Sequence, residues 1–139
     1  MSNTTWLIRL YDCFRSWNGY NDELVWAALW LHKATGDSSY LNKAQKYYND
    51  FDLEYINEVF SWDDKVAGAK ILLAQATRNT KDMNTVKELC QTYLDQVRSP
   101  KGRSHFMQWG SNRYASNAAF ICLQVCYVCI CTYLNYKRT

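Results

Sequence analysis

Proline and glycine are scarce in this chain of 139 residues, which contains one proline and five glycines. A protein built from many short strands and tight turns needs more of both residues, so this composition argues against an all-β fold. Neither sign of charge predominates strongly, because 16 basic and 13 acidic side chains leave a formal net charge of only +3. A charge this small and this widely spread predicts no nucleic-acid partner.

Several signatures of chemistry are absent as well. The sequence contains no Ser-His-Asp order, no phosphate-binding P-loop and no glycine-rich dinucleotide fingerprint. Six cysteines are present, four of them within ten residues, whereas a disulfide scaffold would spread them among loops. Cys126 and Cys129 form a lone CxxC motif, and no second motif or paired histidine completes a zinc site. We therefore expect free buried thiols on a helix, no metal and no cofactor.

The chain is rich in rings instead, with six Trp, eleven Tyr and five Phe, and 48% of its residues are hydrophobic. A chain with this hydrophobic content can bury a core, and its length is typical of one domain, over residues 1–139. The first 13 residues contain no apolar run followed by a cleavage site, so we expect no signal peptide. Residues 114–136 are uncharged and long enough to cross a bilayer, but their polar Asn117 and Gln124 favour a buried helix over a membrane span.

Apolar periodicity predicts five helices, over residues 22–35, 38–51, 62–77, 81–97 and 111–125. The first, third and fifth are apolar almost all round, whereas the second and fourth have one apolar stripe. A helix that is apolar all round must be covered on all sides, and a one-stripe helix is covered on one side. An inner ring of helices backed by an outer ring satisfies both requirements.

An internal repeat supports this arrangement. An offset of 42 residues relates Asp22 to Asp64 and Leu31 to Leu73. Repeated helical hairpins of this length are typical of a solenoid or a closed helical toroid. If successive helices alternate in direction, the three inner helices run parallel and their N-termini meet at one rim.

Three aromatic residues and one arginine come just before or inside the first turns of the predicted inner helices. They are Tyr20, Trp62, Trp109 and Arg113. Flat rings beside a few polar groups suit a ligand with apolar faces and many hydroxyls, such as a sugar chain. The rings could instead cover the helical core, and the arginine could pair with a carboxylate of an inner helix.

Acidic residues at the same helix starts allow two interpretations. They are Asp22, Glu23, Asp63 and Asp64, and carboxylates of this kind can act as a general acid and base. They can also cap helices and offset the N-terminal dipole. We favour capping, because adjacent residues on a helix do not face each other.

Glycoside hydrolase family 9, the endo-β-1,4-glucanases of animals, plants and bacteria, is the family that several segments of the sequence resemble. The segments are YNDELVWAALWLHKATGDSSYL (20–41), FSWDDK (60–65), SPKG (99–102), WGSNRYA (109–115) and NAAF (117–120). Together they cover about residues 17–123, in the same order as in the family, and their residues are most similar to those of the animal branch.

The resemblance implies an all-α fold of helical hairpins forming part of an (α/α)6 barrel. It implies a cleft at the rim in which Trp62, Trp109 and Arg113 bind glucosyl units of cellulose, with Tyr20 at the same cleft. It also implies hydrolysis of β-1,4-glucosidic bonds with inversion, which uses two carboxyl groups, and an extracellular location.

The family's catalytic aspartate and glutamate motifs do not occur in this sequence, so we assign no catalytic residue. We expect a partial catalytic domain, a divergent apolar tail over 124–139, and weak or no hydrolysis by this chain alone. Inner-helix faces left open would favour aggregation or association. The alternative is a helical-repeat protein-interaction module without catalysis.

Overall fold

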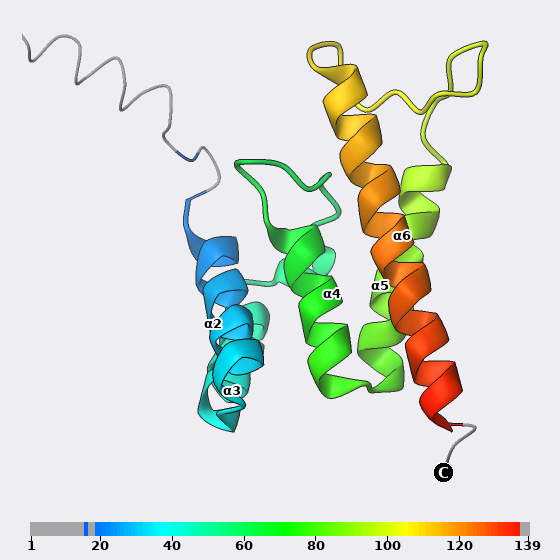
Figure 1. Ribbon diagram of the computed structural model, residues 1–139. Helices are drawn as coiled ribbons and strands as arrows, with labels where there is room; N and C mark the ends of the chain where they lie inside the picture. Colours follow the sequence, from blue (N-terminus) through cyan, green and yellow to red (C-terminus); the bar gives the residue numbers. More distant parts are fainter. Residues whose placement is uncertain (1–15, 17–18, 137–139) are drawn as a thin grey trace, which may run out of the picture.

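The computed structural model of the chain describes residue 16 and residues 19–136, with side chains as far as residue 130 (Figure 1). In order, its helices are α2 (Asn21–Thr35), α3 (Ser38–Asp50), the 3₁₀ turn η1 (Leu53–Tyr55), α4 (Val66–Thr77), α5 (Thr80–Leu94) and α6 (Ser111–Tyr136). Within these ranges there is no strand, only one isolated β-bridge between Arg98 and Ser104. The all-α prediction is confirmed.

The helices form two layers. α2, α4 and α6 run parallel, with their N-termini at the same end of the molecule (Figure 1). α4 contacts both α2 and α6, while α3 packs against α2 and α5 packs against α4 and α6. The predicted inner helices are therefore neighbours, and each one-stripe helix lies against them.

Local capping explains where most helices begin and end. α2 ends because Gly36 adopts φ +73°, and its N–H donates to the carbonyl of His32 at 2.8 Å. The Asp37 carboxylate accepts from the N–H of Ser39 at 2.7 Å and starts α3. Asn79 does the same for α5, accepting from the N–H of Asp82 at 2.8 Å.

The predicted start of the third helix is wrong by four residues. Ser61 does accept the N–H groups of Asp63 and Asp64, at 3.2 and 3.1 Å. Its own N–H donates to the carbonyl of Asp64, which closes a separate turn before α4 begins at Val66. The capping pattern was therefore recognised correctly, but the element that it caps is a turn.

Two other helix ends also differ from prediction. α5 stops at Leu94 rather than 97, because the chain turns into the bridge at Arg98. α6 continues eleven residues past the predicted end at 125, as far as Tyr136. Nothing between these points breaks a helix, since the segment contains neither glycine nor proline.

The core consists of two clusters that share α4. One packs α2, α3 and η1 against α4 and includes Val25, Leu29, Ala44, Tyr48, Leu53 and Leu73. The other packs α5 and α6 against α4 and includes Ile71, Val86, Leu89, Tyr93, Ile121 and Val125. α4 is consequently buried from Val66 to Ala74, as expected for a helix with neighbours on all sides.

The cysteines differ from expectation. Cys90 of α5 and Cys122 of α6 form a disulfide, and Cys126 is a free, exposed thiol. The expectation of free buried thiols on one helix is therefore wrong for Cys122, which is bonded, and for Cys126, which is exposed. The two bonded cysteines are far apart in sequence, and only the packing of α5 on α6 brings them together.

α6 also passes a simple test for a membrane span. Over Ser111–Ile130 it is long and apolar enough to cross a bilayer, and it is the one such helix in the described part of the chain. Its Ile121, Val125 and Val128 are buried in the second core cluster. A core helix of this length passes the same test.

Candidate functional site

The three predicted rim aromatics are all exposed. Tyr20 is 68% exposed just before α2, Trp62 is 50% exposed in the turn before α4, and Trp109 is 82% exposed just before α6. The three helices start at the same end of the molecule (Figure 1), and each of these residues lies just before one of them. Large apolar side chains left in water at one end of a domain are typical of a ligand-binding surface.

Arg113 belongs to the first turn of α6. That turn begins at Gly110, whose φ of +68° favours glycine and whose carbonyl accepts the N–H of Arg113 at 2.9 Å. The guanidinium lies over the ring of Tyr114, 4.6 Å from its centroid. Among the described residues Arg113 forms no ion pair with a carboxylate. This disfavours the alternative that Arg113 pairs with a carboxylate of an inner helix.

Lys65 holds the turn that carries Trp62. Its ammonium donates to the carbonyl of Ser61 at 2.8 Å and to the carbonyl of Trp62. The same ammonium lies 5.9 Å from the ring centroid of Phe60. Two charge-assisted hydrogen bonds fix the backbone at Trp62, so the exposed ring is mounted on an ordered turn.

Asp22 and Asp64 are buried, at 4% and 5% exposure, and both bind backbone N–H groups. Asp64 accepts from Val66 at 2.9 Å and caps α4 from just before it. Asp22 accepts from Lys65 at 2.6 Å, so its carboxylate caps the neighbouring helix rather than its own. The capping interpretation is confirmed for Asp64, whereas Asp22 binds the residue before α4 and does not cap its own helix α2.

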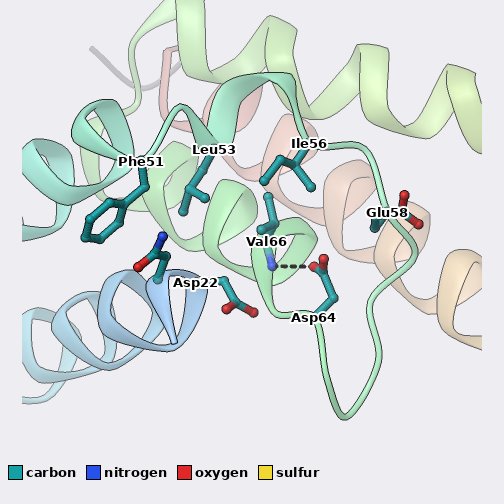
Figure 2. A pocket seen from close by; sticks show the side chains of 8 residues that line it. Asp22, Phe51, Leu53, Ile56, Glu58, Asp64 and Val66 are labelled. Carbon is teal, nitrogen blue, oxygen red and sulfur yellow. Dashed lines mark hydrogen bonds between the residues drawn. The ribbon is translucent and has the colours of Figure 1, made fainter. Parts of the chain in front are cut away.

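A pocket of about 260 Å³ lies beside these two carboxylates (Figure 2). Its lining consists of Asn21, Asp22, Phe51, Leu53, Ile56, Glu58, Asp64 and Val66. Figure 2 shows apolar Phe51 on one side and acidic Glu58 on the other. The pocket therefore lies between the first turns of α2 and α4 and the segment that follows α3.

Burial and crowding of carboxylates change the protonation of this region. Desolvation, with the carboxylates of Asp22 and Glu58 as smaller contributions, raises the pKa of Asp64 above its usual range. Desolvation and then the side chain of Asp22 raise the pKa of Glu23 to about 7. Among the described residues no group of three or more His, Cys, Asp or Glu side chains is placed to hold a metal ion.

Lys70 is a buried charged residue that the sequence pattern does not predict. It lies in the apolar helix α4 and is only 2% exposed. Its ammonium donates to the carbonyls of Glu54 and Ile56, at 3.0 and 2.7 Å, and to the Asn57 amide oxygen at 3.0 Å. Burial lowers its pKa to about 8. A lone lysine in an apolar helix is the only signal that could have drawn attention to it.

Parallel inner helices, antiparallel outer helices and an aromatic rim at the inner N-termini define one class of architecture, part of a helical toroid. Comparison with known proteins agrees with that class. The model of glycosyl hydrolase family 9 matches residues 9–137 of the sequence. The chain belongs to glycosyl hydrolase family 9.

Two similar proteins are named endoglucanases. The chain is 37% identical to endoglucanase B of Cellulomonas fimi over 122 residues, which are 79% of this chain and 12% of that protein. It is 37% identical to endoglucanase 22 of Oryza sativa subsp. japonica over 129 residues, which are 78% of this chain and 23% of that protein.

A solved structure is similar as well. The endoglucanase of the termite Nasutitermes takasagoensis matches with a TM-score of 0.75 and 41% identity, over 78% of this chain and 25% of that one. The helical hairpins are thus those of an (α/α)6 barrel. The chain spans between about an eighth and a quarter of the length of these relatives.

Proposed function

We propose that this chain binds a β-1,4-glucan such as cellulose at its rim, as part of an endoglucanase that hydrolyses β-1,4-glucosidic bonds. The observation that carries the proposal is the exposure of Tyr20, Trp62 and Trp109 at the shared N-terminal end of α2, α4 and α6. Membership of a family whose similar members are named endoglucanases supports it.

The chemistry of the rim suits this ligand. The two faces of a β-1,4-linked glucosyl unit present C–H groups that pack on aromatic rings, and its edge presents hydroxyls. Trp62 and Trp109 supply the rings, and Arg113 supplies guanidinium N–H donors at the start of α6. Tyr20 supplies a ring together with a hydroxyl, so four side chains provide both kinds of contact.

Hydrolysis itself needs groups beyond these four. Inversion at the anomeric carbon uses one carboxylic acid and one carboxylate, separated by enough space for a water molecule. Asp22 and Asp64 are buried and accept backbone N–H groups, so they are engaged in the fold. We assign no catalytic residue, and the proposal for this chain alone is glucan binding with weak or no hydrolysis, requiring neither cofactor nor metal.

Co-sedimentation with microcrystalline cellulose tests the proposal. Trp62→Ala, Trp109→Ala, Arg113→Gln and Tyr20→Ala should each weaken binding, by roughly tenfold for the tryptophans. Tyr55→Ala is the matched control, because Tyr55 is 80% exposed on η1 and is not a proposed contact. Equal binding by all variants would contradict the proposed binding site. Rapid release of reducing ends from soluble cellulose would contradict the expectation of weak or no hydrolysis.

We further propose that residues 1–139 form a partial catalytic domain, with the motif-bearing part at 17–123, and that the protein is extracellular. The disulfide between Cys90 and Cys122 supports the location, because such bonds persist in oxidising compartments.

Inner-helix side chains remain exposed along α2 and α6. They are Trp30, Leu31, Phe120, Leu123 and Ile130. Their exposure supports the proposal that the isolated chain associates through these faces. Sedimentation velocity at increasing concentration tests it, and a concentration-independent monomer would contradict it.

A further inference from the structure

The segment between η1 and the Trp62 turn is extended and has no strand beside it. Ile56 has φ −87° and ψ 120°, and residues 56–60 belong to no helix or strand. Alternate carbonyls of an extended chain point to the same side, so those of Ile56, Glu58 and Phe60 share one face. No strand supplies donors to these three carbonyls, and part-buried side chains of the neighbouring helices donate to them instead.

Three helices each supply one donor. Lys70 of α4 donates to the carbonyl of Ile56 at 2.7 Å, and the Tyr93 hydroxyl of α5 donates to that of Glu58 at 2.6 Å. The Asn117 amide of α6 donates to the carbonyl of Phe60 at 2.7 Å. We call these three donor side chains the carbonyl clamp.

Asn117 is the member nearest to the rim. Its acceptor, Phe60, lies two residues before Trp62, and its own helix carries Arg113 four residues earlier. Residues four apart on a helix lie on the same side, so one hydrogen bond joins the Trp62 segment to the α6 surface that presents Arg113. Since Trp109 lies two residues before the start of α6 at Ser111, it depends on the same helix for its position.

We propose that Asn117 is a positioning residue, which holds Trp62 in register with Trp109 and Arg113 so that one glucan chain contacts all three. This proposal rests on the glucan-binding function proposed above and adds a specific alignment mechanism. Asn117 touches no sugar and acts through the carbonyl of Phe60. Tyr93 and Lys70 hold the preceding part of the same segment.

Fluorine NMR of the whole chain labelled with 5-fluorotryptophan tests the positioning directly. The Trp62 resonance is assigned by its loss in Trp62→Phe. Asn117→Ala should shift or broaden that resonance and leave the Trp30 resonance unchanged. Tyr93→Phe, which removes one hydroxyl and keeps the ring, should perturb Trp62 less. Asn84→Ala on the exposed side of α5 is the matched control and should change neither signal.

A double-mutant cycle with cellohexaose separates alignment from general destabilisation. Asn117→Ala should weaken binding by about fivefold to tenfold in the wild-type background, the value of one hydrogen bond. In the Trp62→Ala background it should have almost no further effect, because the ring that it positions is gone. Additive losses, or an unchanged Trp62 resonance in Asn117→Ala, would overturn the proposal. If the wild-type chain binds no cellohexaose, glucan binding fails while the resonance still decides the positioning.

Discussion

The carboxylate of Asp22, in the first turn of α2, accepts the backbone N–H of Lys65 at 2.6 Å and so closes the N-terminus of α4. At the other end of the same pair of helices, Lys33 donates to the amide oxygen of Gln75 at 3.3 Å. Lys33 and Gln75 are separated by 42 residues, which is the period of the sequence repeat. The repeat therefore has a direct structural meaning, since equivalent positions on neighbouring inner helices meet.

Asp22→Ala removes the acceptor and leaves the Lys65 N–H without its partner. Losing a buried hydrogen bond of this kind should lower the free energy of unfolding by about 1–3 kcal/mol, measured by urea denaturation. Asp22→Asn should cost less, because an amide oxygen can still accept. Asp50→Asn is the control, since the exposed pair of Asp50 with Lys46 should contribute under about 1 kcal/mol. A loss in Asp22→Ala no larger than in this control would contradict the assignment.

Gly68→Ala tests the close approach of α2 to α4. A Cβ at this position would lie 2.4 Å from the Trp26 ring and 2.9 Å from the Phe60 ring. Helix propensity alone predicts that this change stabilises the protein by about 1 kcal/mol. Overpacking should dominate and destabilise it by about 1–3 kcal/mol, seen as a lower Tm. A higher Tm would show that the rings move aside freely.

Much of the fold was predictable from the sequence, because local signals specify helices. Gly36 and Asp37 mark the boundary between α2 and α3 with side-chain and backbone chemistry confined to a few residues. The alternation of broad and one-stripe apolar faces predicted the two layers. The predicted rim residues Tyr20, Trp62 and Trp109 are exposed at the starts of the three inner helices.

The features that the sequence does not predict depend on contacts between distant residues. Ser61 looks the same whether it caps a turn or a helix, and only the carbonyl of Asp64 folding back distinguishes them. Burial of Lys70 is tolerated because its ammonium donates hydrogen bonds to carbonyls 14 and 16 residues away. Cys90 and Cys122 meet through helix packing, which spacing along the chain does not encode.

Removal of the disulfide should destabilise the protein. The bond joins residues 32 apart, and closing a loop of this size contributes about 3–4 kcal/mol by restricting the unfolded chain. The double variant Cys90→Ala/Cys122→Ala should lose about that much in urea denaturation, and dithiothreitol should destabilise only the wild type. Cys126→Ser, at an exposed free thiol, is the control and should change nothing. Equal stability with and without reductant would contradict a bond between α5 and α6.

Glu23 should make the protein less stable as the pH rises. Desolvation and then Asp22 raise its pKa from 4.5 to about 7, so the folded state holds this proton more tightly than the unfolded chain does. Between pH 4.5 and 7 the folded state binds more protons, and its stability falls as the pH increases through that window. Glu23→Gln should match the wild type at pH 4 and exceed its urea midpoint at pH 8. A difference that does not change with pH would contradict the shift.

Isothermal titration of the chain with cellohexaose, beside maltohexaose as the α-1,4-linked control, tests glucan recognition at the rim most directly. Measurable binding of cellohexaose is expected, with much weaker binding of maltohexaose, whose curved chain cannot lie flat along rings at one rim. The double variant Trp62→Ala/Trp109→Ala should reduce the cellohexaose affinity at least roughly tenfold. Equal binding of both sugars, or full affinity in the double variant, would contradict glucan binding by these residues.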